Sequence, residues 1–280
     1  MNVRNVIKTI QGQHSIDGAG VHLIRVLGPR DVRDIDPFLM LDAFDSKNPE
    51  NYIKGFPMHP HRGIETITYL IEGEVTHKDS LGNGGTIHGG ESQWMTAGRG
   101  ILHEEMPQPV DKFYGLQIWL NLPQKEKMVE PNYFDITKDM IKKVNLPNDD
   151  GIVRVISGKY DSQEGAHSNH VQVSIFDISL NPRTEFELPI DPENNLFIYI
   201  FEGEGFFDDK EEALVGEKTV AVFDEGDTFK VTSGVEGIRF MLFAGKPLNE
   251  PIAWGGPIVM NTDDELEEAF NELQQGTFIK

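Results

Sequence analysis

The stretch Tyr69-Leu70-Ile71-Glu72-Gly73-Glu74 occurs a second time, in altered form, as Tyr199-Ile200-Phe201-Glu202-Gly203-Glu204. Each copy is typical of a β-strand that runs into a Glu-Gly turn and then into another strand. The likeness continues further along the chain. The stretch from Gly90-Glu91 to Thr96-Ala97-Gly98 is matched by Gly226-Asp227 to Thr232-Ser233-Gly234. Two copies of one β-barrel unit explain this internal repeat.

Short runs of β-branched and aromatic residues fill most of the chain, separated by Gly, Asn, Asp and Pro. Their spacing is typical of antiparallel sandwiches and barrels. Strands are predicted at 66–71, 117–120, 153–156, 171–175, 196–201, 219–223 and 238–243. We therefore predict an all-β protein made of two antiparallel β-barrels of the double-stranded β-helix, or jelly-roll, type.

One helix is predicted close to the C-terminus. Thr262 and Glu265 have the spacing of a capping box, and Gly276 is a suitable stop. The apolar residues between them recur at helical intervals and form one face: Leu266, Ala269, Phe270 and Leu273.

The boundary between the two repeats is expected at 130–150, where Pro, Asn, Asp and Gly residues cluster. We predict an N-terminal domain, 1–135, and a C-terminal domain, 136–280, that ends in the helix. All nine histidines lie at or before His170. Where the first repeat has His59-Pro60-His61, the second has Pro189-Ile190-Asp191. A histidine cluster is therefore expected only in the N-terminal domain.

Composition excludes several kinds of function. The 280 residues include no cysteine, so disulfides, thiolate metal sites and cysteine nucleophiles are absent. The net charge of −21 disfavours direct binding to nucleic acid, because such a surface repels phosphates. No apolar run is long enough to span a membrane, and the first residues lack the pattern of a signal peptide. We expect a cytoplasmic protein without membrane contact.

Two pairs of side chains have the spacing of metal ligands. In a strand, residues i and i+2 point to the same face, so His59 and His61 can aim together into a barrel interior. The same holds for His103 and Glu105. A single His-x-His is usually coincidental. Two same-face pairs, each beside a glycine-rich turn, instead predict one mononuclear metal site with three nitrogen ligands and one oxygen ligand.

The spacing of these residues resembles the cupin signature, and three longer stretches resemble the pirin family within it. The stretches are Asp36-Pro37-Phe38-Leu39-Met40-Leu41-Asp42, His59-Pro60-His61-Arg62-Gly63, and the residues from Gln93-Trp94-Met95 through His103-Glu104-Glu105-Met106-Pro107. The resemblance is dense over 30–125 and weak beyond 150. Ala97 or Thr96 stands where the general cupin pattern has a proline.

The resemblance implies a bicupin with one metal, most often iron, in the N-terminal barrel. Its ligands fall on His59, His61, His103 and Glu105. Several pirins cleave the flavonol quercetin with dioxygen, and animal members are described as nuclear, iron-dependent transcriptional coregulators. We therefore expect a quercetin 2,3-dioxygenase-like oxidoreductase. The alternative is a non-enzymatic iron-binding regulator that acts through a protein partner. A monomer is expected in either case.

The donor set alone leaves the metal open. Imidazole and carboxylate suit Fe(II), Zn, Ni, Cu or Mn, and four protein ligands on an octahedral ion leave two positions for substrate or dioxygen. Glu105 is the single carboxylate in the set. Our hypothesis is that it also acts as the catalytic base that accepts the proton of a flavonol hydroxyl.

Neighbouring residues have simpler expected roles. Glu65 matches a general cupin glutamate but is expected to support the ligands from behind or to be structural, and Arg62 is expected to pair with an acid near the site. Met58, Met95 and Met106 are expected to form an apolar wall of the cavity. The remaining histidines are expected to be exposed: His14, His22, His77, His88, His167 and His170.

Overall fold

The computed structural model describes residues 2–208 and 214–279, which form two compact units. The first unit contains 13–32, 37–138 and 248–280, and the second contains 1–12, 33–36 and 139–247. The chain passes between them near Asp139, close to the predicted boundary. The termini, however, group differently from a single cut after residue 135, because 1–12 belong with the second unit and 248–280 with the first.

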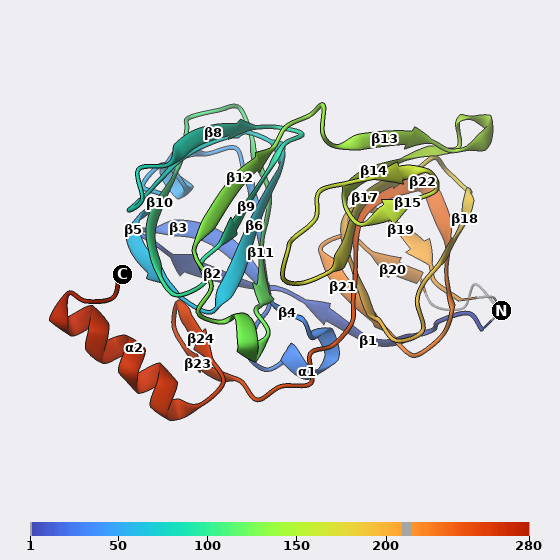
Figure 1. The fold of residues 1–280 in the computed structure, drawn as a ribbon. Coiled ribbons are helices and arrows are strands. Elements are labelled where there is room, and N and C mark those ends of the chain that lie inside the picture. The colour runs from blue at the N-terminus through green and yellow to red at the C-terminus, as the bar shows by residue number, and fades with distance from the viewer. Residues whose placement is uncertain (1, 209–213, 280) are drawn as a thin grey trace. The chain divides into compact units, whose positions relative to one another are not determined.

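Two antiparallel sheets build the first unit (Figure 1). The larger runs in the order β12-β9-β6-β11-β4-β3-β2, and the smaller in the order β5-β10-β7-β8. The strands of the larger sheet are β2 (Gln13–Asp17), β3 (Val21–Leu27), β4 (Phe38–Ser46), β6 (Ile64–Glu72), β9 (Ser92–Thr96), β11 (Phe113–Asn121) and β12 (Asn132–Ile136). Those of the smaller sheet are β5 (Phe56–His61), β7 (Glu74–Asp79), β8 (Gly84–His88) and β10 (Ile101–Pro107).

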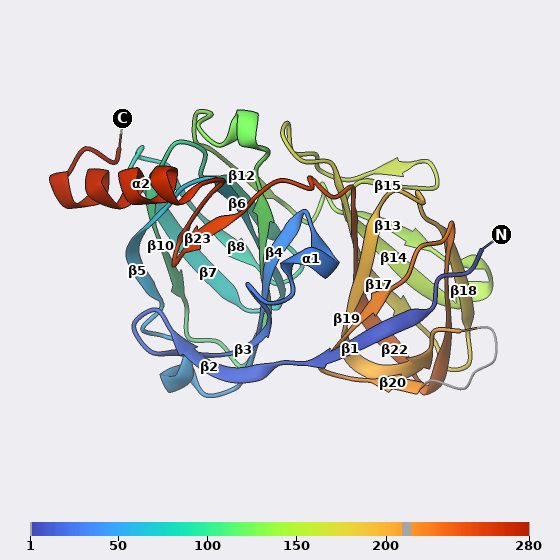
Figure 2. The same ribbon diagram turned by 90° about the horizontal axis from the view of Figure 1, so that it is seen from below.

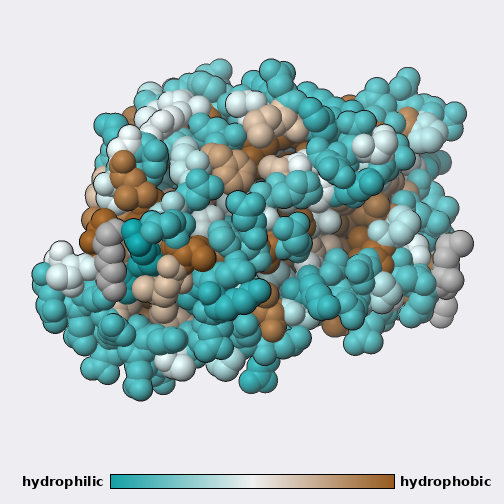
Figure 3. Space-filling model, in the orientation of Figure 1, coloured by the Kyte–Doolittle hydropathy of each residue, from teal (hydrophilic) through white to brown (hydrophobic). Residues whose placement is uncertain are grey.

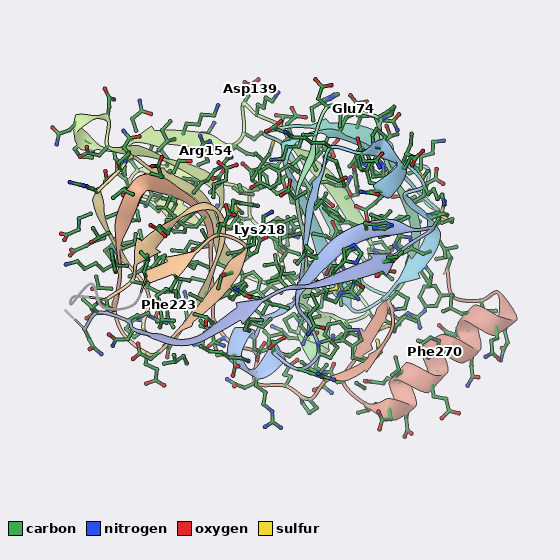
Figure 4. All side chains as sticks on the ribbon, turned by 180° about the vertical axis from the view of Figure 1, so that it is seen from behind. Glu74, Asp139, Arg154, Lys218, Phe223 and Phe270 are labelled. Atoms are coloured by element: carbon green, nitrogen blue, oxygen red, sulfur yellow. The ribbon has the colours of Figure 1, made fainter. Side chains whose placement is uncertain are left out.

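The C-terminal segment adds a small hairpin and a helix to this unit, side by side in Figure 1. They are β23 (Ala253–Gly255), β24 (Ile258–Met260) and α2 (Asp263–Gln275). Thr262 and Glu265 form the predicted capping box, and Gly276 ends the helix in the left-handed conformation. Figure 4 labels Phe270 on the predicted apolar face, which packs against Ile258 and Met260. The helix prediction is confirmed.

One antiparallel sheet, in the order β1-β21-β19-β22-β17-β14-β13, carries the second unit, and β18 and β20 pair at its side. β1 lies among these strands in Figure 2 because it pairs with β21. The elements are β1 (Val6–Gln11), α1 (Val32–Ile35), β13 (Lys142–Asn145), β14 (Gly151–Ser157), β15 (Lys159–Tyr160), β16 (Gln163–Glu164), β17 (Val173–Leu180), β18 (Glu185–Pro189), β19 (Asn195–Phe206), β20 (Leu214–Gly216), β21 (Thr219–Phe223) and β22 (Thr228–Gly245). Short 3-10 turns occur at Pro49–Asn51, Gln124–Glu126 and Pro147–Asp149.

The all-β prediction is confirmed, with one difference between the repeats. In the first repeat, Gly73 has a φ of 121° and lets the chain step from β6 in one sheet to β7 in the other. In the second, Gly203 lies inside the continuous strand β19, where the register with β22 shifts. The predicted Glu202-Gly203 turn is therefore wrong. It is a β-bulge, which bends a strand without ending it.

Each unit has its own apolar core, as alternating strand patterns require. In the second unit the core is rich in phenylalanine, including Phe223, labelled in Figure 4. In the first unit, core clusters lie around Phe113 and around Met95. Among the described residues, no helix has the length and apolar character needed to cross a membrane.

Candidate metal centre

The two predicted ligand pairs lie on neighbouring strands. β5 and β10 are antiparallel, and His103 is the direct cross-strand partner of His59. The register shifts between His103 and Glu105, so that Glu105 stands opposite Phe56. Burial alternates along β10, which turns both His103 and Glu105 inward. The sequence therefore predicts correctly how the backbone brings the pairs together.

Three imidazoles converge at this place. Suitable ligand atoms of His59, His61 and His103 all lie within 4.8 Å of one another. The ring centroids of His59 and His103 are 4.4 Å apart, and those of His61 and His103 are 5.0 Å apart. The triad is half-buried at His59 and buried at the other two rings. This arrangement is able to bind a metal ion.

The tautomers of two rings follow from their hydrogen bonds. The Nδ1 atoms of His59 and His61 each lie 2.9 Å from a backbone carbonyl, that of Pro57 and that of Pro257 respectively. A carbonyl oxygen can only accept, so each Nδ1 carries the proton and each Nε2 has a free lone pair. These two Nε2 atoms lie 3.1 Å apart. In these tautomers both lone pairs point into the triad, where a cation would be shared between them.

Burial holds two of the three rings, His61 and His103, neutral. Burial, reinforced by the neighbouring His59, lowers the pKa of His61 from 6.5 to about 3. Burial also places the pKa of His103 well below its usual value. The Nε2 atom of His103 is buried without a hydrogen-bond partner among the described residues. Metal–nitrogen bonds of roughly 2.1 Å at a right angle would separate two ligand atoms by about 3 Å, close to the His59–His61 distance. The residues thus fit a metal ion.

Glu105 lies beside the triad and outside the group of three. Its carboxyl oxygens contact the hydroxyl of Thr68 at 2.9 Å and the amide nitrogen of Gln117 at 3.3 Å. The Thr68 hydroxyl also lies 2.5 Å from the carbonyl oxygen of the Gln117 side chain. A hydroxyl has one proton and cannot serve both oxygens. If Glu105 is protonated, each group donates once and accepts once, and the ring of three hydrogen bonds closes. Burial raises the pKa of Glu105, in agreement with this neutral form.

Thr68 and Gln117 belong to a polar row across the larger sheet. Asp135, Gln93, Thr68, Gln117, Asp42 and Arg25 are successive cross-strand partners on β12, β9, β6, β11, β4 and β3. Direct partners in an antiparallel sheet share a face. At one end, Arg25 donates to both oxygens of Asp42, at 2.9 and 2.7 Å. These six residues therefore form a polar strip across one face of the larger sheet, whose strands are mostly apolar.

A cavity of about 710 Å³ is lined by two residues of the triad, His59 and His61. Polar groups at its wall include Arg25, Asp42, Thr68, Glu105 and Gln117, and Arg25 is the only lysine or arginine among its lining residues. Most of the remaining wall is aromatic or aliphatic: Met40, Phe44, Phe56, Val75, Phe113, Trp119 and Trp254. The volume and mixed lining are typical of a small-molecule site.

Several predictions about neighbouring residues are wrong. Met58 is exposed to solvent and Met95 is fully buried in a core cluster, so neither forms the cavity wall, which is mainly aromatic. His77 was expected at the surface but is only 3 % exposed, because it lies on the inner face of β7 opposite Glu105. Its ring contacts Tyr133 and receives a hydrogen bond from Gln93.

Two other expectations are confirmed. Glu65 is buried and accepts a hydrogen bond from Thr96 at 2.7 Å, which is a structural role. Arg62 pairs with an acid as expected, at 2.6 Å, but this acid is Glu272 on α2, which is not among the residues that line the cavity.

Four further residues belong to the site and were not predicted from the sequence: Thr68, Gln117, Trp254 and Pro257. For Thr68 and Gln117 a signal existed, since each is a polar residue at the centre of an apolar strand. For Trp254 and Pro257 none existed, because they reach the site from the far end of the chain.

The fold and the site define the class: a two-unit cupin protein with a histidine triad in its first unit that is able to bind a metal ion. The family model for pirin matches residues 20–120, and that for the pirin C-terminal cupin domain matches residues 175–279. The chain belongs to the pirin family.

Named relatives agree with this assignment. A pirin-like protein of Caulobacter vibrioides is 41% identical over 99% of this chain and 100% of its own length. Human pirin is 38% identical over 97% of this chain and 92% of its own. The crystal structure of a quercetin 2,3-dioxygenase from Acinetobacter baumannii matches with a TM-score of 0.90 and 33% identity, covering 99% of this chain and 98% of that one.

Proposed function

We propose that this protein is a metal-dependent dioxygenase that cleaves quercetin-type flavonols with dioxygen at a mononuclear site of His59, His61, His103 and Glu105. The observation that carries the proposal is the convergence of the Nε2 atoms of His59 and His61 in the wall of a largely aromatic cavity. The likeness to the quercetin 2,3-dioxygenase of Acinetobacter baumannii supports the choice of substrate.

The metal in this proposal is Fe(II), with Ni, Cu, Mn and Zn compatible with the same donors. When bound, such an ion supplies open coordination positions and electron transfer toward dioxygen. The chain's own contribution is to orient the imidazoles and to keep the buried ones neutral. The carbonyls of Pro57 and Pro257 orient His59 and His61, and burial keeps His61 and His103 neutral.

Glu105 is the residue proposed to handle the proton. It lies in the cavity wall beside the triad, and Thr68 and Gln117 hold its two oxygens. As a carboxylate it would accept the proton of a flavonol hydroxyl, and the ring with Thr68 and Gln117 would then hold the neutral acid. Burial raises its pKa, which strengthens it as a base.

The cavity suits a flat, hydroxylated aromatic molecule. The ring of Trp119 lies edge-on to His61, with centroids 5.0 Å apart, and stacks on Trp254 at 5.9 Å. These rings offer apolar faces close to the triad. Hydrogen-bonding groups for hydroxyl substituents come from the polar row, in particular Gln117 and Asp42.

The test is oxygen uptake with quercetin by protein of known metal content. We expect uptake by the wild type and none by His59→Ala, whereas His14→Ala, which changes an exposed histidine on β2, keeps the wild-type rate. If fully metallated protein consumes no member of a flavonol panel, the dioxygenase proposal fails. The alternative, a non-enzymatic metal-binding regulator with a protein partner, would then account for the same triad.

A further inference from the structure

The cavity is partly built by a segment from the far end of the chain. Residues 248–280 belong to the first unit, and Trp254, Gly256 and Pro257 within them line the cavity together with His59 and His61. Pro257 and His61 are 196 residues apart in sequence. One wall of the candidate metal centre therefore exists only while this segment is packed in place.

The segment also orients a ligand. The carbonyl of Pro257 accepts the hydrogen bond from Nδ1 of His61 at 2.9 Å, and this contact fixes which ring nitrogen faces the triad. Partners of this kind, on the far side of a metal-binding imidazole, typically change metal affinity by about 10- to 100-fold when they are removed.

Lys127 forms hydrogen bonds that hold the segment in place close to Pro257. Its ammonium group is buried and donates to the carbonyls of Gly63 at 2.8 Å and Val259 at 2.9 Å, and to the side chain of Asn121 at 2.5 Å. An ammonium has three N–H donors, so all three are used. Gly63 itself packs so closely that a Cβ atom there would lie 2.0 Å from the Val259 carbonyl oxygen.

Arg62 contacts the end of the segment and holds it in place. Its guanidinium is buried, donates to the carbonyl of Phe278 at 3.1 Å, pairs with Glu272 at 2.6 Å and lies 4.1 Å from the centre of the Phe278 ring. These two sets of contacts involve Gly63 and Arg62, the two residues that directly follow His61. The rest of α2 presents acidic side chains outward, and the region around it is largely hydrophilic in Figure 3.

From these contacts we propose that residues 248–280 help the metal centre to bind its ion. The docking of this segment and the binding of metal are coupled through the Pro257–His61 hydrogen bond. The inference rests on the proposed metal site. Coupling of this kind is reciprocal: bound metal must tighten the docking of the segment by the same factor by which docking tightens the metal.

Two variants loosen the segment without changing a ligand. Lys127→Met removes the hydrogen bond to the Val259 carbonyl. Phe278→Ala removes the aromatic ring that the Arg62 guanidinium contacts. Glu268→Ala is the matched control, because Glu268 is exposed on the same helix. For each protein, the Kd for nickel(II) is measured by competition with a chelator. Hydrogen exchange of residues 253–260 is measured with and without nickel(II).

We expect nickel(II) to slow exchange of 253–260 in the wild type at least tenfold. We expect Lys127→Met to raise the Kd about 10- to 100-fold. Phe278→Ala should also raise the Kd, by a smaller factor, and Glu268→Ala should leave the Kd unchanged. If either loosened variant exchanges faster at 253–260 yet binds nickel(II) with the wild-type Kd, the coupling is disproved. If the wild type itself binds no nickel(II), the proposed metal site fails, which is a separate result.

Discussion

The Nε2 atoms of His59 and His61 lie 3.1 Å apart although both rings have placed their protons on the opposite nitrogen, toward backbone carbonyls. Both lone pairs therefore point to the place where a metal ion would bind. A cation that binds there, to the folded state alone, raises stability by mass action.

The first prediction concerns this gain in stability. Ni(II) or Fe(II) at 100 times its Kd should stabilise the wild type by about 2.7 kcal/mol, measured as a rise in the thermal midpoint. His59→Ala should show no such rise, whereas His14→Ala should behave like the wild type. An equal rise in the His59 variant would place the metal elsewhere.

A second prediction concerns pH. Folding lowers the pKa of His61 from 6.5 to about 3. Between pH 6.5 and pH 3, His61 is therefore protonated in the unfolded chain and neutral in the folded protein. The stability that His61 contributes is therefore fully present above pH 6.5 and is lost as the pH falls toward 3, by up to about 1.4 kcal/mol per pH unit.

The check is urea unfolding of metal-free protein at several pH values from 7.5 to 4, for the wild type and for His61→Gln. The difference between the two curves isolates the contribution of this ring. Parallel curves would mean that His61 titrates at its ordinary pKa in the folded protein.

A third prediction tests the proton-accepting role of Glu105. Glu105→Gln has nearly the same shape as the protonated acid and can still donate to Thr68, so the fold and the neighbouring contacts should survive. We expect turnover of quercetin to fall by about 10²- to 10⁴-fold, the usual contribution of a positioned base. Turnover at the wild-type rate, in protein that still binds metal, would show that Glu105 is not the base.

A fourth prediction concerns the ring that holds Glu105. Thr68→Val keeps the shape of the side chain but removes the hydroxyl between Glu105 and Gln117. We expect kcat/KM to fall about tenfold, which corresponds to roughly 1.4 kcal/mol, with metal content unchanged. Thr68→Ser should restore most of the activity. If the serine variant is as impaired as the valine variant, packing rather than the hydroxyl is responsible.

The sequence predicts the local parts of this molecule well. His59 with His61, and His103 with Glu105, follow from the period of two in a strand, and the helix from 263 to 275 follows from its capping box and apolar face. In each case the relevant residues lie within a few positions of one another, so a local pattern is sufficient.

Features that depend on distant contacts were not predictable in this way. The Pro257 carbonyl reaches His61 only through the packing of the C-terminal segment. His77 looks like any surface histidine until β7 is paired with β10. The Glu-Gly pair likewise has one local sequence and two outcomes, a change of sheet at Gly73 and a bulge at Gly203, because different partner strands surround it.

The interleaving of the two units has a consequence for synthesis on the ribosome. β1 is made long before β21, the strand with which it pairs. The strands that hold the histidines are likewise made long before Trp254, Pro257 and Phe278. The first unit cannot finish folding until residues 248–280 have been made, so a nascent chain should acquire a complete metal centre only after that point. Truncated translation products would carry every histidine and still lack one wall of the site.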